Sequence, residues 1–134
     1  MTIILYKARR EDNKEWVKGY VVRPYSRDEE DNIKSYCFNA IDEKGWFSEC
    51  IVEAQTICQY IGLEDANKEQ MFEHDIIQIP GEDEYFHLKW EEDSARFVME
   101  SESLIVDFDN YWAYEVEVVG NIFDSAYMME LSAE

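Results

Sequence analysis

The sequence contains no apolar run long enough to cross a membrane. A membrane-spanning helix needs roughly 20 consecutive apolar residues, and no stretch of this 134-residue chain approaches that length. The first seven residues carry no basic segment ahead of their short apolar run, so a signal peptide is not expected. We therefore expect a small, soluble, cytoplasmic protein that makes no use of a membrane.

Cysteine is the second scarce residue. The three cysteines, Cys37, Cys50 and Cys58, include no CxxC pair, and their odd number fits a reducing compartment. A reactive thiol needs a basic neighbour that lowers its pKa, and the sequence indicates none. We interpret all three as small buried apolar residues.

Positive charge is also scarce. The chain has 12 Lys and Arg against 31 Asp and Glu, which gives a net charge of −19. Nucleic acids and anionic membranes are bound by clustered cations, so this balance argues against both as ordinary partners. Two interpretations remain: the acidic surface keeps the protein soluble, or it engages a basic partner, including by imitating DNA.

The motifs of catalysis and metal binding are absent. The sequence has no phosphate-binding loop, no dinucleotide-binding glycine pattern and no GxSxG element. His74 and His87 lie outside any zinc-binding pattern, and 31 acids produce carboxylate pairs by chance. On an alternating strand His87 would share a face with Tyr85 and Lys89. We predict no catalytic residues, no metal ligands and no cofactor, and hence a protein that is not an enzyme.

One acidic segment begins like a calcium-binding loop. Asp65, Asn67 and Glu69 have the alternate spacing of the first ligands in such a loop. The loop also needs Gly at its sixth position and Glu at its twelfth, where Gln70 and Ile76 stand here. We interpret the segment as an exposed polar turn.

Short β-prone segments bounded by turn residues occupy most of the chain. No segment keeps a 3.6-residue apolar repeat long enough to predict a major helix. Gly19 indicates a bulge or a close backbone approach, and Pro24 is expected to end the second strand. A short helix is expected over 125–131, while 55–61 is either a strand or a helical turn. We expect strands over 3–7, 16–22, 35–41, 46–52, 75–79, 85–90, 96–99 and 115–119, with acidic loops over 26–32 and 101–110.

This spacing of strands is typical of a barrel or a sandwich, so we expect a mostly β protein with little helix. We expect one domain, 1–134, in which 1–55 and 56–134 are candidate subdomains. Aromatic side chains could form the core or a binding platform. The aromatic candidates are Trp16, Tyr20, Trp46, Trp90, Trp112 and Tyr114, and the predicted core contains Tyr60, Leu63, Phe72, Ile76, Trp90 and Val118.

The centre of the chain resembles the YopX family of phage and prophage proteins. The matching residues are Thr56, Gln59, Tyr60, Gly62, Leu63, Asp65, Asn67, Glu73, Asp75 and Ile76. Lys68 and His74 replace two family glycines, and this puts the geometry of the turns in question because Gly adopts positive φ at low cost. The segments 13–20 and 114–123 are similar to the opening hairpin and closing strand of the family, with Lys89-Trp90 and Arg96-Phe97 between them. The segment 7–10 departs from the family pattern.

The resemblance implies a mostly β fold with an SH3-like barrel in the C-terminal half and no established catalytic residue set. It implies a phage or prophage accessory protein in a bacterial host, of unknown function, which we expect to bind a host or phage protein. Exposed sheet edges also favour a homo-oligomer. We expect Gly62, Asp65, Asn67 and Asp75 to set turns, and whether the segment 62–75 is functional or structural stays open.

Three alternatives to this function remain. The first is an acidic DNA mimic that inhibits a host DNA-binding protein. The second is an SH3-like nucleic-acid-binding module, for which the sequence offers one cluster of cations: Lys7, Arg9, Arg10, Lys14 and Lys18. The third is a hydrolase whose site is assembled from distant residues.

Overall fold

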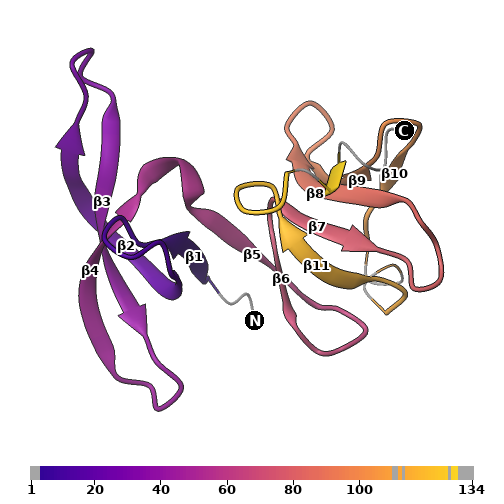
Figure 1. Ribbon diagram of the computed structural model, residues 1–134, viewed down its shortest axis with the longest axis horizontal. Helices are drawn as coiled ribbons and strands as arrows, with labels where there is room; N and C mark the ends of the chain where they lie inside the picture. The colour runs from indigo at the N-terminus through magenta and orange to yellow at the C-terminus, as the bar shows by residue number, and fades with distance from the viewer. Residues whose placement is uncertain (1–3, 110–111, 113, 127, 130–134) are drawn as a thin grey trace. The chain divides into compact units, whose positions relative to one another are not determined.

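The chain folds into antiparallel strands connected by short turns (Figure 1). The computed structural model describes residues 4–109, 112, 114–126 and 128–129. The chain divides into two compact units, Met1–Tyr60 and Ile61–Glu134. The predicted mostly β fold with little helix is confirmed.

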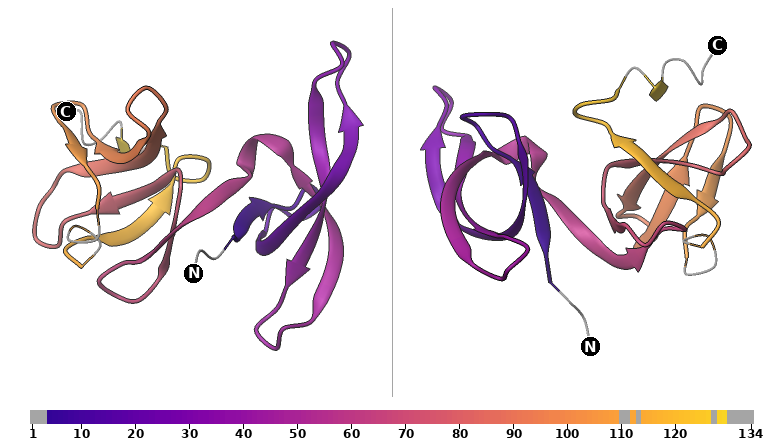
Figure 2. Two further views of the ribbon diagram at one scale, coloured as in Figure 1. Left: turned by 180° about the vertical axis from the view of Figure 1, so that it is seen from behind. Right: turned by 60° about the horizontal axis from the view of Figure 1, so that its bottom comes forward.

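The first unit is built on a curled antiparallel sheet (Figure 2). The strand order of this sheet is β4-β3-β2-β1-β5-β6. The boundary between the two units falls within β5, so the last strand of the sheet, β6, belongs to the second unit. A short 3₁₀ helix, η1, connects β4 to β5 and resolves the ambiguous segment 55–61. The elements are β1 (Tyr6–Arg9), β2 (Trp16–Arg27), β3 (Ile33–Ile41), β4 (Phe47–Glu53), η1 (Ala54–Thr56), β5 (Cys58–Glu64) and β6 (Gln70–Phe72).

Two features of β2 test the sequence interpretation. A Cβ atom at Gly19 would lie 1.9 Å from the carbonyl oxygen of Asn39, so the predicted close backbone approach is confirmed. Pro24 does not end the strand, and that prediction is wrong. Instead β2 continues to Arg27, with register shifts against β3 on both sides of Pro24, and these irregularities accommodate a residue that has no N–H to donate.

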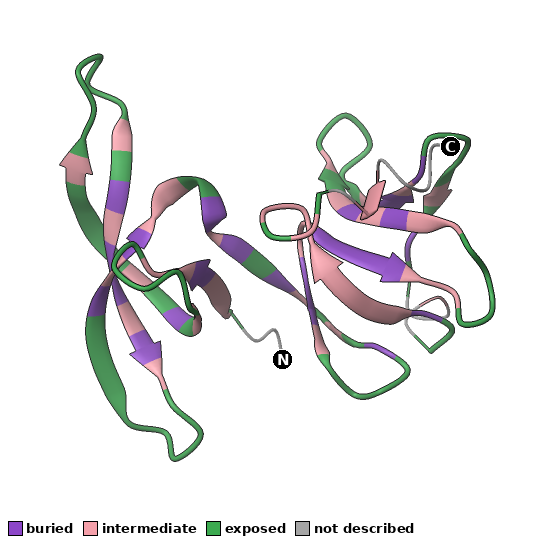
Figure 3. Ribbon diagram, in the orientation of Figure 1, coloured by how far each residue is buried: buried purple, intermediate pink, exposed green. Residues whose placement is uncertain are grey.

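Buried positions recur along the strands of the first unit (Figure 3). The core of this unit consists of Ala8, Phe38, Ala40, Cys50 and Val52. All three cysteines are reduced and buried, which agrees with their interpretation as small apolar residues. Burial also raises the pKa of the Cys50 thiol, so its reactive thiolate form is disfavoured.

The second unit contains a five-stranded antiparallel sheet of order β10-β9-β8-β7-β11. The last strand in the sequence, β11, pairs antiparallel with the first strand of this sheet, β7. In the described part of the chain no ladder connects β10 to β11, so the sheet stays open and the expected SH3-like barrel is not closed. The strands are β7 (Asp75–Gln78), β8 (Tyr85–Glu91), β9 (Arg96–Glu100), β10 (Ile105–Asp107) and β11 (Glu117–Asn121).

Most predicted core residues are buried. Tyr60, Phe72 and Ile76 are buried, and Leu63 and Val118 are half-buried against the core of the second unit. The core of this unit is formed by Met71, Ile77, Phe86, Leu88, Met99, Phe108 and Val116.

Trp90 does not belong to this core, because 41% of its surface is exposed, and that prediction is wrong. Alternation along β8 puts Trp90 on the face of Phe86 and Leu88, but it lies at the end of the β8–β9 hairpin. There its ring packs edge-on against Phe97, with 5.0 Å between the ring centroids.

Several element boundaries also differ from the sequence predictions. The first strand begins at Tyr6 rather than at residue 3, and β2 ends at Arg27 rather than at residue 22. Strand β10 lies inside the segment 101–110 that was expected to be a loop. The expected helix over 125–131 includes residues 127, 130 and 131, which lie outside the described residues.

Candidate functional site

An apolar groove on the first unit is the principal candidate site. It has a volume of about 580 Å³ and is lined by tyrosines from three neighbouring strands: Tyr6 on β1, Tyr20 on β2 and Tyr36 on β3. The remaining lining residues are Ile4, Val21, Ala54 and Ile57. We call this feature the tyrosine groove.

The position of the tyrosine groove follows from the packing beneath it. Tyr6, Val21, Tyr36 and Ile57 are half-buried and rest on the core of the first unit, so the floor of the groove is fixed by that core. Ile4 and Tyr20 are more open, with 59% and 39% of their surface exposed. The groove therefore combines a rigid floor with apolar groups that reach solvent.

The other predicted aromatic residues do not gather into one platform. Trp16 is half-buried and lies beneath the Lys7 ammonium group, which is 5.2 Å from its ring centroid. Trp46 and Tyr114 are exposed at 71% and 70%, and Trp112 packs against the core of the second unit. Only Tyr20 of the predicted set lines the groove. Tyr6 and Tyr36 were missed, because only strand pairing brings them beside Tyr20.

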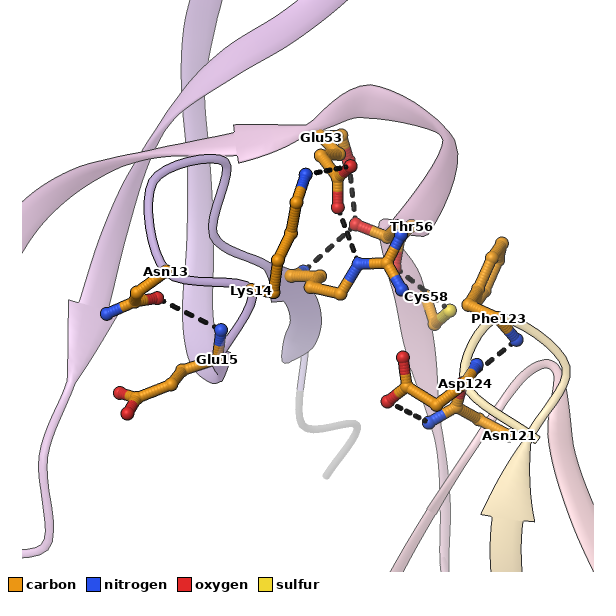
Figure 4. A network of polar contacts seen from close by, with 10 residues as sticks. Asn13, Lys14, Glu15, Glu53, Thr56, Cys58, Asn121, Phe123 and Asp124 are labelled. Atoms are coloured by element: carbon orange, nitrogen blue, oxygen red, sulfur yellow. Dashed lines mark hydrogen bonds and ion pairs between the residues drawn. The ribbon is translucent and has the colours of Figure 1, made fainter.

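A second hollow of the first unit, of about 530 Å³, is polar. Its lining residues include Glu11, Lys14, Asp28, Lys34 and Glu53, so acids and cations face each other across it. Figure 4 shows Glu53 in contact with Lys14 in this region. Its two carboxylate oxygens accept hydrogen bonds from Arg9 Nε at 2.6 Å and Lys14 Nζ at 2.9 Å.

These contacts of Glu53 have an electrostatic consequence. The hydrogen bond from Arg9 lowers the pKa of the Glu53 carboxyl, and the bond from Lys14 adds to the effect. Thr56 extends the network, since its hydroxyl accepts the Arg9 N–H at 2.9 Å and donates to the Glu53 carbonyl at 2.7 Å. The network joins η1 to β1 and has a structural role.

The predicted turn role of Asp65 and Asp75 is confirmed. Asp65 Oδ1 accepts the N–H groups of Asn67 and Glu69 at 2.8 and 2.9 Å. Asp75 Oδ2 accepts the N–H of Phe72 at 2.8 Å, and both aspartates are buried. Because Asp65 directs both of its oxygens at backbone amides, the segment that begins like a calcium loop is a turn. The described residues contain no group of three or more His, Cys, Asp or Glu side chains placed to hold a metal.

The two positions where glycine was replaced keep a glycine-like backbone. Lys68 has φ of 66° and His74 has φ of 73°, which is the left-handed region. Gly62 also has positive φ, at 88°, but it lies within β5, so the prediction that it sets a turn is wrong. The turns of the segment 62–75 therefore persist although two of their residues carry side chains.

The two histidines form a contact that the sequence did not indicate. His74 Nδ1 and His87 Nε2 are 2.8 Å apart, which is a hydrogen bond. Burial lowers the pKa of His87 to about 4, and the proximity of His74 contributes. Because one nitrogen donates and the other accepts, at least one of the rings is neutral. The pair joins the turn before β7 to β8, and its two facing nitrogens are occupied by each other.

Charge is divided unequally between the two units. The first unit carries nine Lys and Arg against 11 Asp and Glu, which leaves −2. The second carries three against 20, which leaves −17. Nearly all of the net negative charge of the chain therefore belongs to the second unit.

The comparisons with known proteins give a family and no closer relative. No helix of the described residues has the length and apolarity that crossing a membrane requires. No curated protein matches the chain. The family model described as YopX protein matches residues 5–130 and so spans both units. The chain belongs to the YopX family.

Proposed function

We propose that this protein is a non-enzymatic accessory protein of a phage or prophage, and that it binds a host or phage protein in the bacterial cytoplasm. The family supports the phage origin. The observation that carries the binding role is the tyrosine groove, in which three tyrosines from adjacent strands line one apolar hollow. Its lining offers apolar groups and tyrosine hydroxyls, which suit recognition better than catalysis.

The chemistry of the tyrosine groove fits a protein partner. Tyrosine is enriched in the parts of protein interfaces that contribute most to affinity. Its ring supplies apolar contact area and its hydroxyl supplies a hydrogen bond, at the entropic cost of only two side-chain torsions. A partner that inserts an apolar side chain beside Ile4 and Tyr20 would bury surface that is now exposed.

The test uses the tagged full-length protein in extracts of phage-infected host cells. The substitution Ile4→Glu puts a charge in the groove at an exposed position, and Leu104→Glu is the matched control because Leu104 is a similarly exposed apolar residue of the second unit. We expect wild type and L104E to capture the same partner, and I4E to lose it. Equal capture by I4E, with an unchanged circular dichroism spectrum, would contradict the proposal.

The alternative of a DNA mimic has one observation in its favour, the net charge of −17 on the second unit. A basic partner held by this unit would be released as salt rises, whereas a partner held by the tyrosine groove would be retained. Capture at low and high salt separates the two functions. Competition between duplex DNA and the protein for the same partner would support mimicry.

We do not propose nucleic-acid binding, because acids engage the cations that it would require. Arg9 and Lys14 bind Glu53, and Arg10 Nη2 is 2.8 Å from Asp12 Oδ2. Lys7 lies over the ring of Trp16. The cluster identified in the sequence is therefore largely neutralised by its own neighbours.

A further inference from the structure

We propose that two copies of this protein associate by pairing β4 of one copy with β4 of the other in antiparallel orientation. This inference does not rest on the proposed function, because it uses the edge of the first sheet rather than the tyrosine groove. Among the described strands β4 has one ladder, with β3, and it lies at the edge of its sheet. An unpaired edge is a template for a further strand.

The register of the β3–β4 hairpin shows which groups face outward. The N–H of Asp42 donates to the carbonyl of Trp46 at 3.0 Å, which makes these two residues a hydrogen-bonded pair. Hydrogen-bonded and non-bonded pairs alternate along an antiparallel ladder, so Phe47, Glu49 and Ile51 direct their backbone groups away from β3. The Ile51 carbonyl confirms this direction, since it accepts the N–H of Glu11 at 3.0 Å.

The free part of the edge is therefore short and defined. The loop after β1 occupies the end near Val52, where Arg10 and Val52 form an isolated bridge. The N–H and C=O groups of Phe47 and Glu49 remain available in the described part of the chain. Beside them, Trp46 and Phe47 expose 71% and 55% of their surface.

These groups are complementary to themselves. If a two-fold axis passes beside Ser48, Phe47 of each copy lies opposite Glu49 of the other, and both are outward-facing residues. The two strands can then form four backbone hydrogen bonds. No like charges face each other directly, and each Glu49 has the Arg23 guanidinium of its own chain 3.7 Å away.

The charge distribution argues for a second copy approaching at this place. A chain of net charge −19 repels its own copies, but the first unit contributes only −2. The exposed aromatic groups of Trp46 and Phe47 thus lie on the unit where self-association meets least repulsion. Pairing of two β4 strands would bury these aromatic side chains and would also give hydrogen-bond partners to the backbone groups of the edge.

The test is sedimentation velocity of the full-length protein from about 5 to 500 µM, a range that detects micromolar dimers. Glu49→Pro removes an outward-facing N–H, so it blocks edge pairing without removing a bond to β3. Glu49→Ala is the matched control, because it removes the same carboxylate and keeps the N–H. We expect wild type and E49A to form dimers, and E49P to weaken them at least about tenfold.

Two further measurements test the proposal independently of whether E49P folds. Phe47→Lys puts a charge on the same edge and is expected to weaken the dimer in the same way. In the wild type, amide exchange of Phe47 and Glu49 should slow as protein concentration rises, while the amide of Ser48, which faces β3, should not change. A wild-type monomer throughout this range, or a dimer unchanged in both E49P and F47K, would overturn the proposal.

Discussion

Asp65 is hydrogen-bonded to β11, where its Oδ2 accepts the backbone N–H of Val118 at 2.8 Å. The two residues are 53 positions apart in the sequence. The neighbouring N–H of Ala66 donates to the carbonyl of Val116 at 2.9 Å, so the turn is attached both to β11 and to the segment just before it. A turn aspartate therefore also fixes the last strand of the second unit, and this gives the segment 62–75 a structural role.

Replacing Asp65 by alanine is expected to lower the free energy of unfolding by about 3 kcal/mol. The substitution leaves three backbone N–H groups without an acceptor, and hydrogen bonds to charged groups contribute about 1.5–3 kcal/mol each, with partial replacement by water. Urea titration measures the loss. Asp42→Ala is the matched control, because exposed Asp42 accepts the N–H groups of Lys44 and Trp46 in a solvated turn. Its loss should be about 1 kcal/mol or less. Equal losses for the two variants would contradict the special role of Asp65.

At the turn that contains Lys68, a substitution is expected to stabilise the protein. Lys68→Gly is expected to raise the free energy of unfolding by about 0.5–1 kcal/mol, because relief of the left-handed backbone exceeds the added entropy of the unfolded chain. Lys44→Gly is the control. Lys44 does not have positive φ, so glycine there should destabilise the protein. Both are measured by urea titration, and a loss of stability in K68G would refute the argument.

Part of this structure could be predicted from the sequence, and part could not. The spacing of β-prone segments and the chemistry of turn residues are local signals, so they predicted most strands and the turn role of Asp65 and Asp75. Alternation placed Trp90 on the correct face of β8 but could not show that the core ends before it. The attachment of Asp65 to Val118 and the convergence of Tyr6, Tyr20 and Tyr36 depend on which strands become neighbours. No local pattern encodes that information.

The histidine pair illustrates the same limit at shorter range. His74 and His87 are 13 residues apart, and their contact arises because the N–H of His74 donates to the carbonyl of Leu88 at 2.7 Å. The alternation of side chains along the predicted strand placed His87 on the same face as Tyr85 and Lys89. That placement gave no indication of a contact with His74. His74 also has a left-handed backbone, a conformation that is uncommon for residues other than glycine and that the sequence did not indicate.

The low pKa of His87 predicts that the protein loses stability under mild acid. The ring has a pKa of about 4 in the folded state and an ordinary value of 6.5. As pH falls from 6.5 towards 4, the unfolded chain binds a proton that the folded protein does not, so unfolding becomes easier, and below about 4 this contribution levels off. Partial contact of the ring with water reduces the effect, which we expect to be about 1 kcal/mol between pH 7 and pH 5.

The measurement is urea titration of wild type and His87→Gln at pH 7, 6 and 5. The variant has no titrating group at this position, so its stability should fall less than that of the wild type over the same range. The subtraction also isolates His87 from carboxyls such as Glu53, whose lowered pKa places their loss of stability at more acidic pH. Lys89 and Glu100, which act on His87 in opposite directions, stay unchanged in the variant. Parallel pH profiles for the two proteins would show that His87 titrates in the folded state much as it does in the unfolded chain.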